Sequence, residues 1–339
     1  MNWLATSVPL TEVWAFIIAG AVFAYVVMDG FDLGIGILFP VFDVGKERDQ
    51  AMNAIAPVWD GNETWLVLGG GGLFAAFPLA YAIILPALYP PIIAMLLGLV
   101  FRGVAFEFRW RDPGHRALWD AAFTAGSFVA ALAQGIILGA LLEGIAVEGR
   151  AYAGGWWDWL SPFSLLTGAS VVAGYALLGA TFLIYKVEGR ANDHARRLAW
   201  RCFWLTGLAI LAVSIGTLFL SGRYIEKWLS TPGLFFTAQV PLLVAILAYA
   251  FVRTMQKGRE LAPFLICLAL FFVTFAGLGI SMWPDIIPGE VSIVDAAAPA
   301  KSQAFMLFGA AIMMPIIIAY TAYAYWVFRG KVGHDGYHD

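Results

Sequence analysis

The sequence predicts an all-α integral membrane protein, and its composition is the first observation behind that class. Of the 339 residues, 61% are hydrophobic and only 13% are charged. A soluble domain carries about 25% charged residues, which it needs to wet its surface. The low charged fraction therefore excludes a soluble enzyme and a nucleic-acid-binding protein, and the net charge of −3 indicates no polyanionic partner. The lipid bilayer is the expected surrounding of most of the chain.

Nine apolar segments form the second observation, because each is long enough to cross a bilayer, which takes about 20 helical residues. Backbone polar groups cannot stay unpaired in lipid, so each segment is expected to be a helix rather than a barrel strand. The second and third segments are separated only weakly, near Pro78. The nine segments are roughly 13–40, 50–77, 79–101, 118–143, 161–186, 198–221, 233–253, 261–283 and 303–328.

The distribution of basic residues predicts the orientation of these segments. Lys and Arg collect in cytoplasmic loops of membrane proteins. Here 16 of the 20 basic residues fall in the loops after the first, third, fifth and seventh segments or in the C-terminal tail. The N-terminus is therefore expected outside and the C-terminus in the cytoplasm.

Acidic residues inside the first two segments are the main functional signal. Asp29 and Asp32 lie in the first segment, and Asp60 and Glu63 lie in the second. At about 1.5 Å per residue, Asp29 and Asp60 are each on the order of 20 Å from the loop that joins the two helices. The spacing therefore predicts carboxylates at a similar depth near mid-membrane, and residues three apart share a helix face.

Two interpretations of these acids stay open from the residues alone. Ionisable groups are costly in a bilayer and usually mark a function, which here would be a proton path. The alternative is structural: the acids cap kinked helices or pair with a buried arginine. Arg102 is expected at the end of the third segment, where it can reach back to neutralise one acid, and Glu107 is expected at the cytoplasmic mouth. Interfacial snorkelling is the alternative for both.

Glycines near the acids predict close helix packing. Gly34, Gly36 and the run Gly69–Gly72 lie within the first two segments. The run is not followed by the Lys-Ser/Thr pair of a phosphate-binding loop. Small residues let membrane helices approach one another, so packing is the expected role of these glycines.

The positions of histidine and cysteine speak against a cofactor bound by this chain. Haem iron needs an axial ligand such as His, Cys, Met or Tyr. The four histidines all fall in predicted cytoplasmic loops or the tail, and the two cysteines are too few for a metal cluster. Neither a haem nor a metal site is expected here. The histidines are His115, His194, His334 and His338.

Three motifs in the first half of the chain resemble a known family. They are Met-Asp-Gly-Phe-Asp-Leu-Gly-Ile-Gly at 28–36, Ala-Pro-Val-Trp-Asp-Gly-Asn-Glu-Thr-Trp at 56–65 and Gly-Gly-Gly-Gly-Leu-Phe-Ala-Ala-Phe-Pro at 69–78. They resemble subunit II of bacterial cytochrome bd quinol oxidases, with the short cyanide-insensitive variant the nearer match. The resemblance implies two four-helix bundles, at about 13–143 and 161–283, and a peripheral ninth helix at about 303–328.

The resemblance also implies a function and partners. Subunit II of this family carries no haem, and its partner, subunit I, carries haems b558, b595 and d. The complex, in the bacterial cytoplasmic membrane, oxidises quinol and reduces oxygen to water with protons drawn from the cytoplasm. Some members hold a structural quinone such as ubiquinone in subunit II, and the sequence places no pocket for it. Nor does the sequence decide whether small single-helix accessory subunits join the complex.

Residue roles carry over from the family by motif. Asp60 matches an acid of the proton channel at the subunit interface, and Asp29 matches another acid of that region. Arg102 matches an arginine near the same channel, and Glu107 stands where some members have Asp. Two alternatives remain at this point. One is a proton-coupled secondary transporter, although transporters tend to show paired halves and the acids here lie in the first half only. The other is a scaffold with acids buried for specificity.

Overall fold

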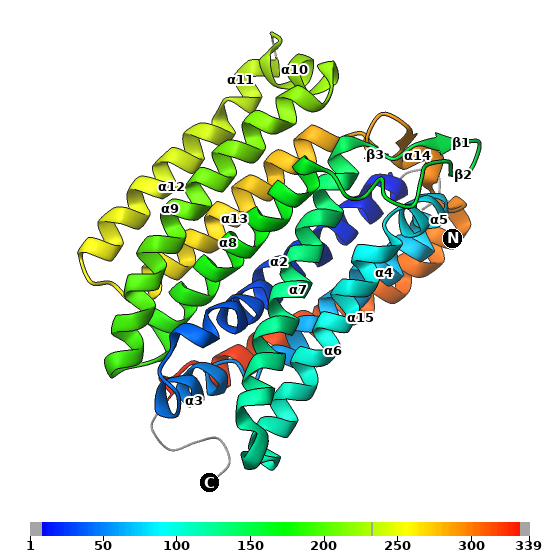
Figure 1. Cartoon of the computed structure of the whole chain (residues 1–339). Coiled ribbons are helices and arrows are strands. Elements are labelled where there is room, and N and C mark those ends of the chain that lie inside the picture. The colour runs from blue at the N-terminus through cyan, green and yellow to red at the C-terminus, as the bar shows by residue number, and fades with distance from the viewer. Residues whose placement is uncertain (1–8, 232, 333–339) are drawn as a thin grey trace.

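The computed structural model describes residues 9–231 and 233–332, and most of them are helical (Figure 1). Four short strands form two antiparallel hairpins in the loops, β1 with β2 and β3 with β4. The elements, in chain order, are α2 (Leu10–Leu38), η1 (Phe39–Val41), α3 (Lys46–Asn53), α4 (Trp59–Ala76), α5 (Pro78–Ala87), α6 (Tyr89–Arg111), η2 (Pro113–His115), α7 (Arg116–Glu143), β1 (Val147–Glu148), β2 (Ala151–Tyr152), α8 (Pro162–Lys186), α9 (Gly189–Leu220), α10 (Gly222–Leu229), α11 (Gly233–Thr237), α12 (Gln239–Gln256), α13 (Leu261–Met282), β3 (Asp285–Ile287), β4 (Val291–Ser292), α14 (Ile293–Ala296) and α15 (Ala300–Val327).

Eight stretches of helix in the described chain are long and apolar enough to span a membrane, one fewer than the sequence predicts. The missing one is the predicted segment 50–77. A turn at residues 54–58 separates α3 from α4, and α4 keeps only 18 residues. Asp60, Asn62, Glu63 and four glycines lower its hydropathy, although α4 packs along α2 as a spanning helix does.

The predicted third segment, 79–101, has the wrong boundaries. Prolines favour the first turn of a helix, and a new helix, α6, begins at Tyr89 with two prolines in its first turn. The residues before it form α5, which has ten residues and is too short to span. Since α6 runs on to Arg111, Arg102 lies inside this helix and not at its end.

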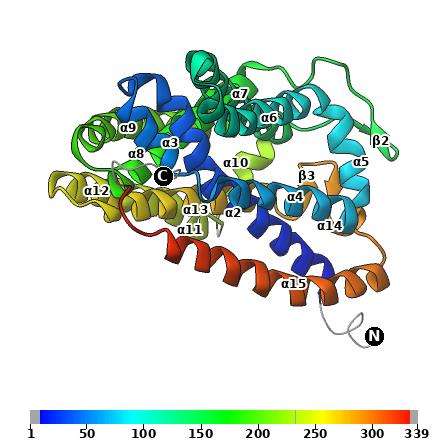
Figure 2. The same cartoon turned by 90° about the horizontal axis from the view of Figure 1, so that it is seen from below.

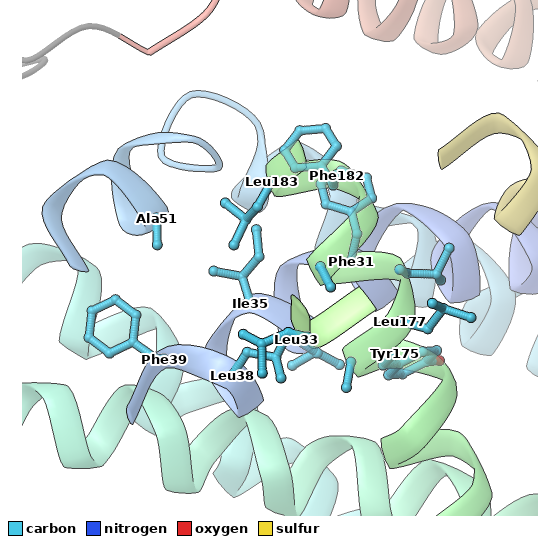
Figure 3. Close-up of a cluster of buried hydrophobic side chains, with 14 of the residues drawn as sticks. Phe31, Leu33, Ile35, Leu38, Phe39, Ala51, Tyr175, Leu177, Phe182 and Leu183 are labelled. Carbon is cyan, nitrogen blue, oxygen red and sulfur yellow. The ribbon is translucent and has the colours of Figure 1, made fainter. Parts of the chain in front are cut away.

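The centre of the bundle is the contact between α2 and α8. Every residue from Asp29 to Gly36 on α2 is buried. In the apolar stretch of α8 that could span a membrane, 72% of the residues are buried. The two backbones meet at Gly34, where an added Cβ would lie 1.8 Å from the Tyr175 carbonyl oxygen. Phe31 stacks on Phe182 with ring centroids 4.1 Å apart (Figure 3). These contacts confirm the packing role predicted for Gly34.

Charged residues tie α3 to the helices beside it at one end of the bundle. Arg109, on α6, donates to Asp120 of α7 across 2.5 Å and to Asp49 of α3 across 2.8 Å. Arg48 of α3 donates to the second oxygen of Asp120 across 2.8 Å. Buried, paired charges of this kind hold short elements in one place. We call this end the α3 end, and the opposite one, with β1–β4, the hairpin end (Figure 1).

The last helix, α15, lies along the outside of the bundle beside α2 and α4 (Figure 2). In the apolar stretch of α15 that could span a membrane, only 6% of the residues are buried. It is anchored at the α3 end, where Lys186 donates to the carbonyl oxygens of Phe328 and Gly330 across 2.5 and 2.8 Å. Lys331 donates in return to the carbonyls of Ile184 and Val187. We call this reciprocal contact of Lys186 and Lys331 the C-terminal clip.

Candidate functional site: a buried acid cluster

Two acids on α2, Asp29 and Asp32, are fully buried. Both lie in the part of α2 that is surrounded by other helices, beside its close contact with α8. Gly30 lies between them, and a Cβ there would come within 2.8 Å of the Tyr175 ring. The glycines of this motif therefore let α8 approach closely enough to shut water away from both carboxylates.

Arg102 of α6 joins Asp29 to an acid on α4. Its guanidinium donates to Asp29 Oδ1 across 2.5 Å and to Glu63 Oε2 across 2.8 Å. Arg102 is completely buried, whereas 29% of the Glu63 side chain is exposed. The contact with an acid predicted from sequence for Arg102 is confirmed. Glu63 makes the cluster reachable from the surface of the chain.

The position of Arg102 follows from the packing of α6 against α7. A Cβ at Gly98 would lie 2.7 Å from the Gly126 carbonyl oxygen, and one at Gly126 would lie 2.9 Å from the Arg102 backbone nitrogen. The backbones of these two helices are in direct contact, so the Cα of Arg102 is fixed in position beside α7. Its guanidinium lies 5.9 Å from the Trp59 ring centre, a cation–π distance.

Asp32 has a different set of partners. Asn62 Nδ2 of α4 donates to Asp32 Oδ2 across 2.8 Å. The Tyr325 hydroxyl of α15 in turn donates to Asn62 Oδ1 across 2.8 Å. Within the described residues, Asp32 is therefore held by a neutral amide, which a phenol from another helix orients, and not by an ion pair.

Three polar atoms of the cluster are buried without a hydrogen-bond partner among the described residues: Asp29 Oδ2, Asp32 Oδ1 and Arg102 Nε. Most buried polar atoms in proteins are paired, because an unpaired one costs about 1–3 kcal/mol. Each unpaired atom of this kind calls for an explanation, and a functional role is one of them.

A third polar chain extends from Asp29 toward the hairpin end. Gln134 of α7 donates to the Tyr25 hydroxyl across 2.8 Å, and the Tyr175 hydroxyl donates to Gln134 Oε1 across 2.7 Å. Tyr25 lies one turn before Asp29 on α2 and interacts with it electrostatically. Neutral polar side chains thus continue the line of acids between α2, α7 and α8.

Two residues predicted from sequence lie outside the cluster. Asp60 is in the first turn of α4 and is exposed, so it makes no part of the buried cluster around Asp29. The reason is that α4 begins only at Trp59 and turns Asn62, not Asp60, toward α2. Glu107 is also exposed and pairs with Arg111 across 3.0 Å on the surface of α6.

The histidines do not join the cluster in the described part of the chain. His115 lies 3.0 Å from Asp112 in the turn before α7, and His194 lies 2.7 Å from Glu47 at the start of α9. Both are at the α3 end, His115 at the end of η2 and His194 within α9 rather than in a loop. His334 and His338 lie outside the described residues.

The sequence missed the polar residues that complete the cluster. Asn62, Tyr25, Gln134, Tyr175 and Tyr325 carry no formal charge, so a search for ionisable groups in apolar segments passes over them. A signal existed only for Asn62, which stands between Asp60 and Glu63 in the same motif.

The fold and the cluster define a class: a multi-pass membrane protein with an ionisable centre among its helices. The chain belongs to the cytochrome bd terminal oxidase subunit II family, whose model matches residues 10–328. It is 28% identical to cytochrome bd-I ubiquinol oxidase subunit 2 of Escherichia coli K12, over 95% of each chain. It is 27% identical to cytochrome bd ubiquinol oxidase subunit 2 of Bacillus subtilis, over 96% of this chain and 97% of that one.

The fold agrees with a solved structure. A chain of the bd oxidase from Geobacillus thermodenitrificans superposes with a TM-score of 0.78 at 18% identity, covering 94% of this chain and 98% of that chain. The protein is therefore a subunit of a respiratory terminal oxidase complex in a bacterial membrane. This family membership overturns the alternative of a secondary transporter.

Proposed function

We propose that this chain is the haem-free subunit II of a quinol:oxygen oxidoreductase, and that it conducts cytoplasmic protons while holding subunit I in place. The relatives named above are ubiquinol oxidases, which supports quinol as the electron donor. The haems of such a complex would reside in subunit I, since the two histidines of the described chain face carboxylates at the bundle end. The observation that carries the proposal is Arg102, which holds buried Asp29 and part-exposed Glu63 together.

The proton route would enter along α4. Asp60 and Glu63 are three residues apart on that helix, and their carboxyl groups interact electrostatically. From Glu63 the Arg102 guanidinium leads to Asp29, and the tyrosines and Gln134 beyond it continue the polar line. Glu107 lies about 7.5 Å from Arg102 along α6, toward the α3 end, where it would form part of the entry.

The basic loops support a proposal for the orientation. The α3 end carries the basic loops, so it would face the cytoplasm, with the N-terminus outside. We assign α4 as a ninth spanning helix because it packs along α2 between spanning neighbours. The helices α2, α4, α6 and α7 would then form one bundle and α8, α9, α12 and α13 the other, with α15 at the periphery.

Subunit I would cover one face of α4, which we call the open α4 face. A bare carboxylate such as Asp60 is costly against lipid, so a protein partner is the expected cover. No other atom lies within 4 Å of a Cβ built at Gly61, Gly70 or Gly71, and small residues admit a close partner helix. The exposed residues of this face are Asp60, Gly61, Thr64, Val67, Gly70, Gly71 and Phe74.

The test is the substitution Asp60→Asn in the complete complex. If Asp60 passes protons, quinol oxidase turnover falls about tenfold, which is about 1.4 kcal/mol of added barrier, while the reduced-minus-oxidised haem spectrum stays intact. Asp193→Asn is the matched control, because Asp193 is an exposed acid near the start of α9. Normal turnover would leave subunit II as a scaffold only. Loss of the haem bands would assign Asp60 to assembly.

A further inference from the structure

The charges of the buried cluster do not balance. Arg102 is the one cation in contact with the acids among the described residues, and it faces Asp29, Asp32 and Glu63. Asp29 and Glu63 take its direct ion pairs. Glu63 is partly solvated, but Asp32 is completely buried and pairs with no cation. An isolated ionised carboxylate in such surroundings is strongly disfavoured.

The hydrogen bonds of Asp32 also disfavour an ionised carboxylate at this position. Its Oδ2 accepts from a neutral amide, and its Oδ1 is buried without a partner. Asp29 also leaves one oxygen, Oδ2, buried and unpaired. The two residues are three apart on α2, so their side chains are neighbours on one helix face, and their carboxyl groups interact electrostatically.

We propose that Asp32 holds a resident proton in the resting complex, with the carboxylate of Asp29 as its nearest neighbouring acceptor. One proton on Asp32 removes the unpaired negative charge and gives its bare oxygen a hydrogen to donate. Asp29 stays ionised because Arg102 neutralises it. This inference deepens the proposed proton conduction and rests on it for the proton's mobility: Asp32 would release one proton inward and recover one from the cytoplasmic side.

Neutral groups from two further helices would set the hydrogen bonding of the protonated Asp32. Asn62 touches Asp32 directly, and Tyr325 orients the Asn62 amide by donating to its oxygen. Because an amide whose oxygen accepts a hydrogen bond keeps its nitrogen as a donor, Tyr325 fixes which end of Asn62 meets Asp32. Tyr325 is therefore a positioning residue for Asp32.

Infrared spectroscopy of the purified complete complex tests the proposal through the C=O stretching band of protonated carboxylic acids. We expect that Asp32→Asn removes one such band. Glu63→Gln keeps it, because two acids still face one arginine. Tyr325→Phe shifts the band, whereas Tyr323→Phe, which alters an exposed tyrosine on the same helix, leaves it in place. An unchanged band in Asp32→Asn, or its loss in Glu63→Gln instead, would overturn the proposal.

Thermal unfolding of the complex gives a second measurement that does not depend on the band. Asn resembles a protonated Asp, so Asp32→Asn should leave the unfolding temperature unchanged, while Asp29→Asn should lower it by breaking the pair with Arg102. Equal losses in the two variants would mean that Asp32 is ionised. If the band is assigned to Asp32 but the Asp60→Asn complex turns over normally, the proposal of proton conduction is contradicted. The proposal that Asp32 is protonated is then still supported.

Discussion

Arg102 and Asp29 meet across 2.5 Å, and neither side chain is exposed to any extent. The pair is sealed because α2 packs against α8, and α6 against α7, at glycines that bring the backbones together. Burial of two charges is costly, and their attraction offsets that cost only while both partners are present. The acid cluster is therefore a point at which single substitutions have large effects.

Replacing Arg102 should destabilise the subunit strongly. Arg102→Gln leaves Asp29 and Glu63 without their cation, which for a buried pair costs about 3–5 kcal/mol. Thermal unfolding of the purified complex measures the loss. Arg111→Gln is the control, since Arg111 makes an exposed pair worth about 0–1 kcal/mol. Equal losses of stability in the two variants would show that the buried pair stabilises the subunit no more than the exposed pair does.

A methyl group at Gly34 should force α2 and α8 apart. Its Cβ would overlap the Tyr175 carbonyl oxygen at 1.8 Å, and that atom belongs to the backbone of a buried helix. We expect Gly34→Ala to cost about 1–3 kcal/mol or to prevent folding. Gly20→Ala on the same helix meets no atom within 4 Å and should gain up to about 1 kcal/mol from helix propensity. A stable Gly34→Ala variant would contradict the close packing.

The open α4 face should tolerate bulk in the isolated subunit but not in the complex. Gly71→Leu fits this chain because nothing lies within 4 Å of the added Cβ. If subunit I docks there, co-purification of the two subunits falls sharply while the variant subunit itself remains monodisperse. Gly207→Leu, at an equally open glycine on α9, should leave the complex intact. Intact assembly in Gly71→Leu would place the interface elsewhere.

Removing the amine of Lys186 should free the end of α15. Lys186→Met keeps the aliphatic stem and deletes the donors to the Phe328 and Gly330 carbonyls. Amide hydrogen exchange in residues 316–332 should become faster, because little else buries this helix. Lys257→Met, at an exposed lysine at the end of α12, provides the comparison. Unchanged exchange in Lys186→Met would mean that the clip does not anchor α15.

The helical class and most of the spans follow from the sequence because lipid imposes a simple demand on length and apolarity. Glycine packing and the reach of Arg102 follow too, since small residues and charges act strongly inside a membrane. The segment at 79–101 was misplaced because its apolar run continues across the α5–α6 break, where only the prolines mark a new helix. Hydropathy alone does not see such a break.

The inward face of α4 could not be predicted for a different reason. Apolar periodicity normally tells which side of a helix is buried, but this helix begins with polar residues and continues with four glycines. The acids do not show which side of this helix meets α2, and the buried positions prove to be Asn62, Trp65, Gly69 and Ala76. The contact between Asn62 and Tyr325 joins residues 263 positions apart, and no local pattern reveals it.

The contact of Tyr325 with Asn62 also sets an order of events during biosynthesis. Membrane chains emerge with the N-terminal helices first, so α2, α4 and α6 are made long before α15. Arg102 can neutralise Asp29 and Glu63 as soon as α6 has entered the bilayer. The amide beside Asp32 obtains its last hydrogen bond only when residue 325 has been translated. The polar centre of the protein is consequently finished by the final helix, so a chain truncated before α15 would reach the membrane with this centre incomplete.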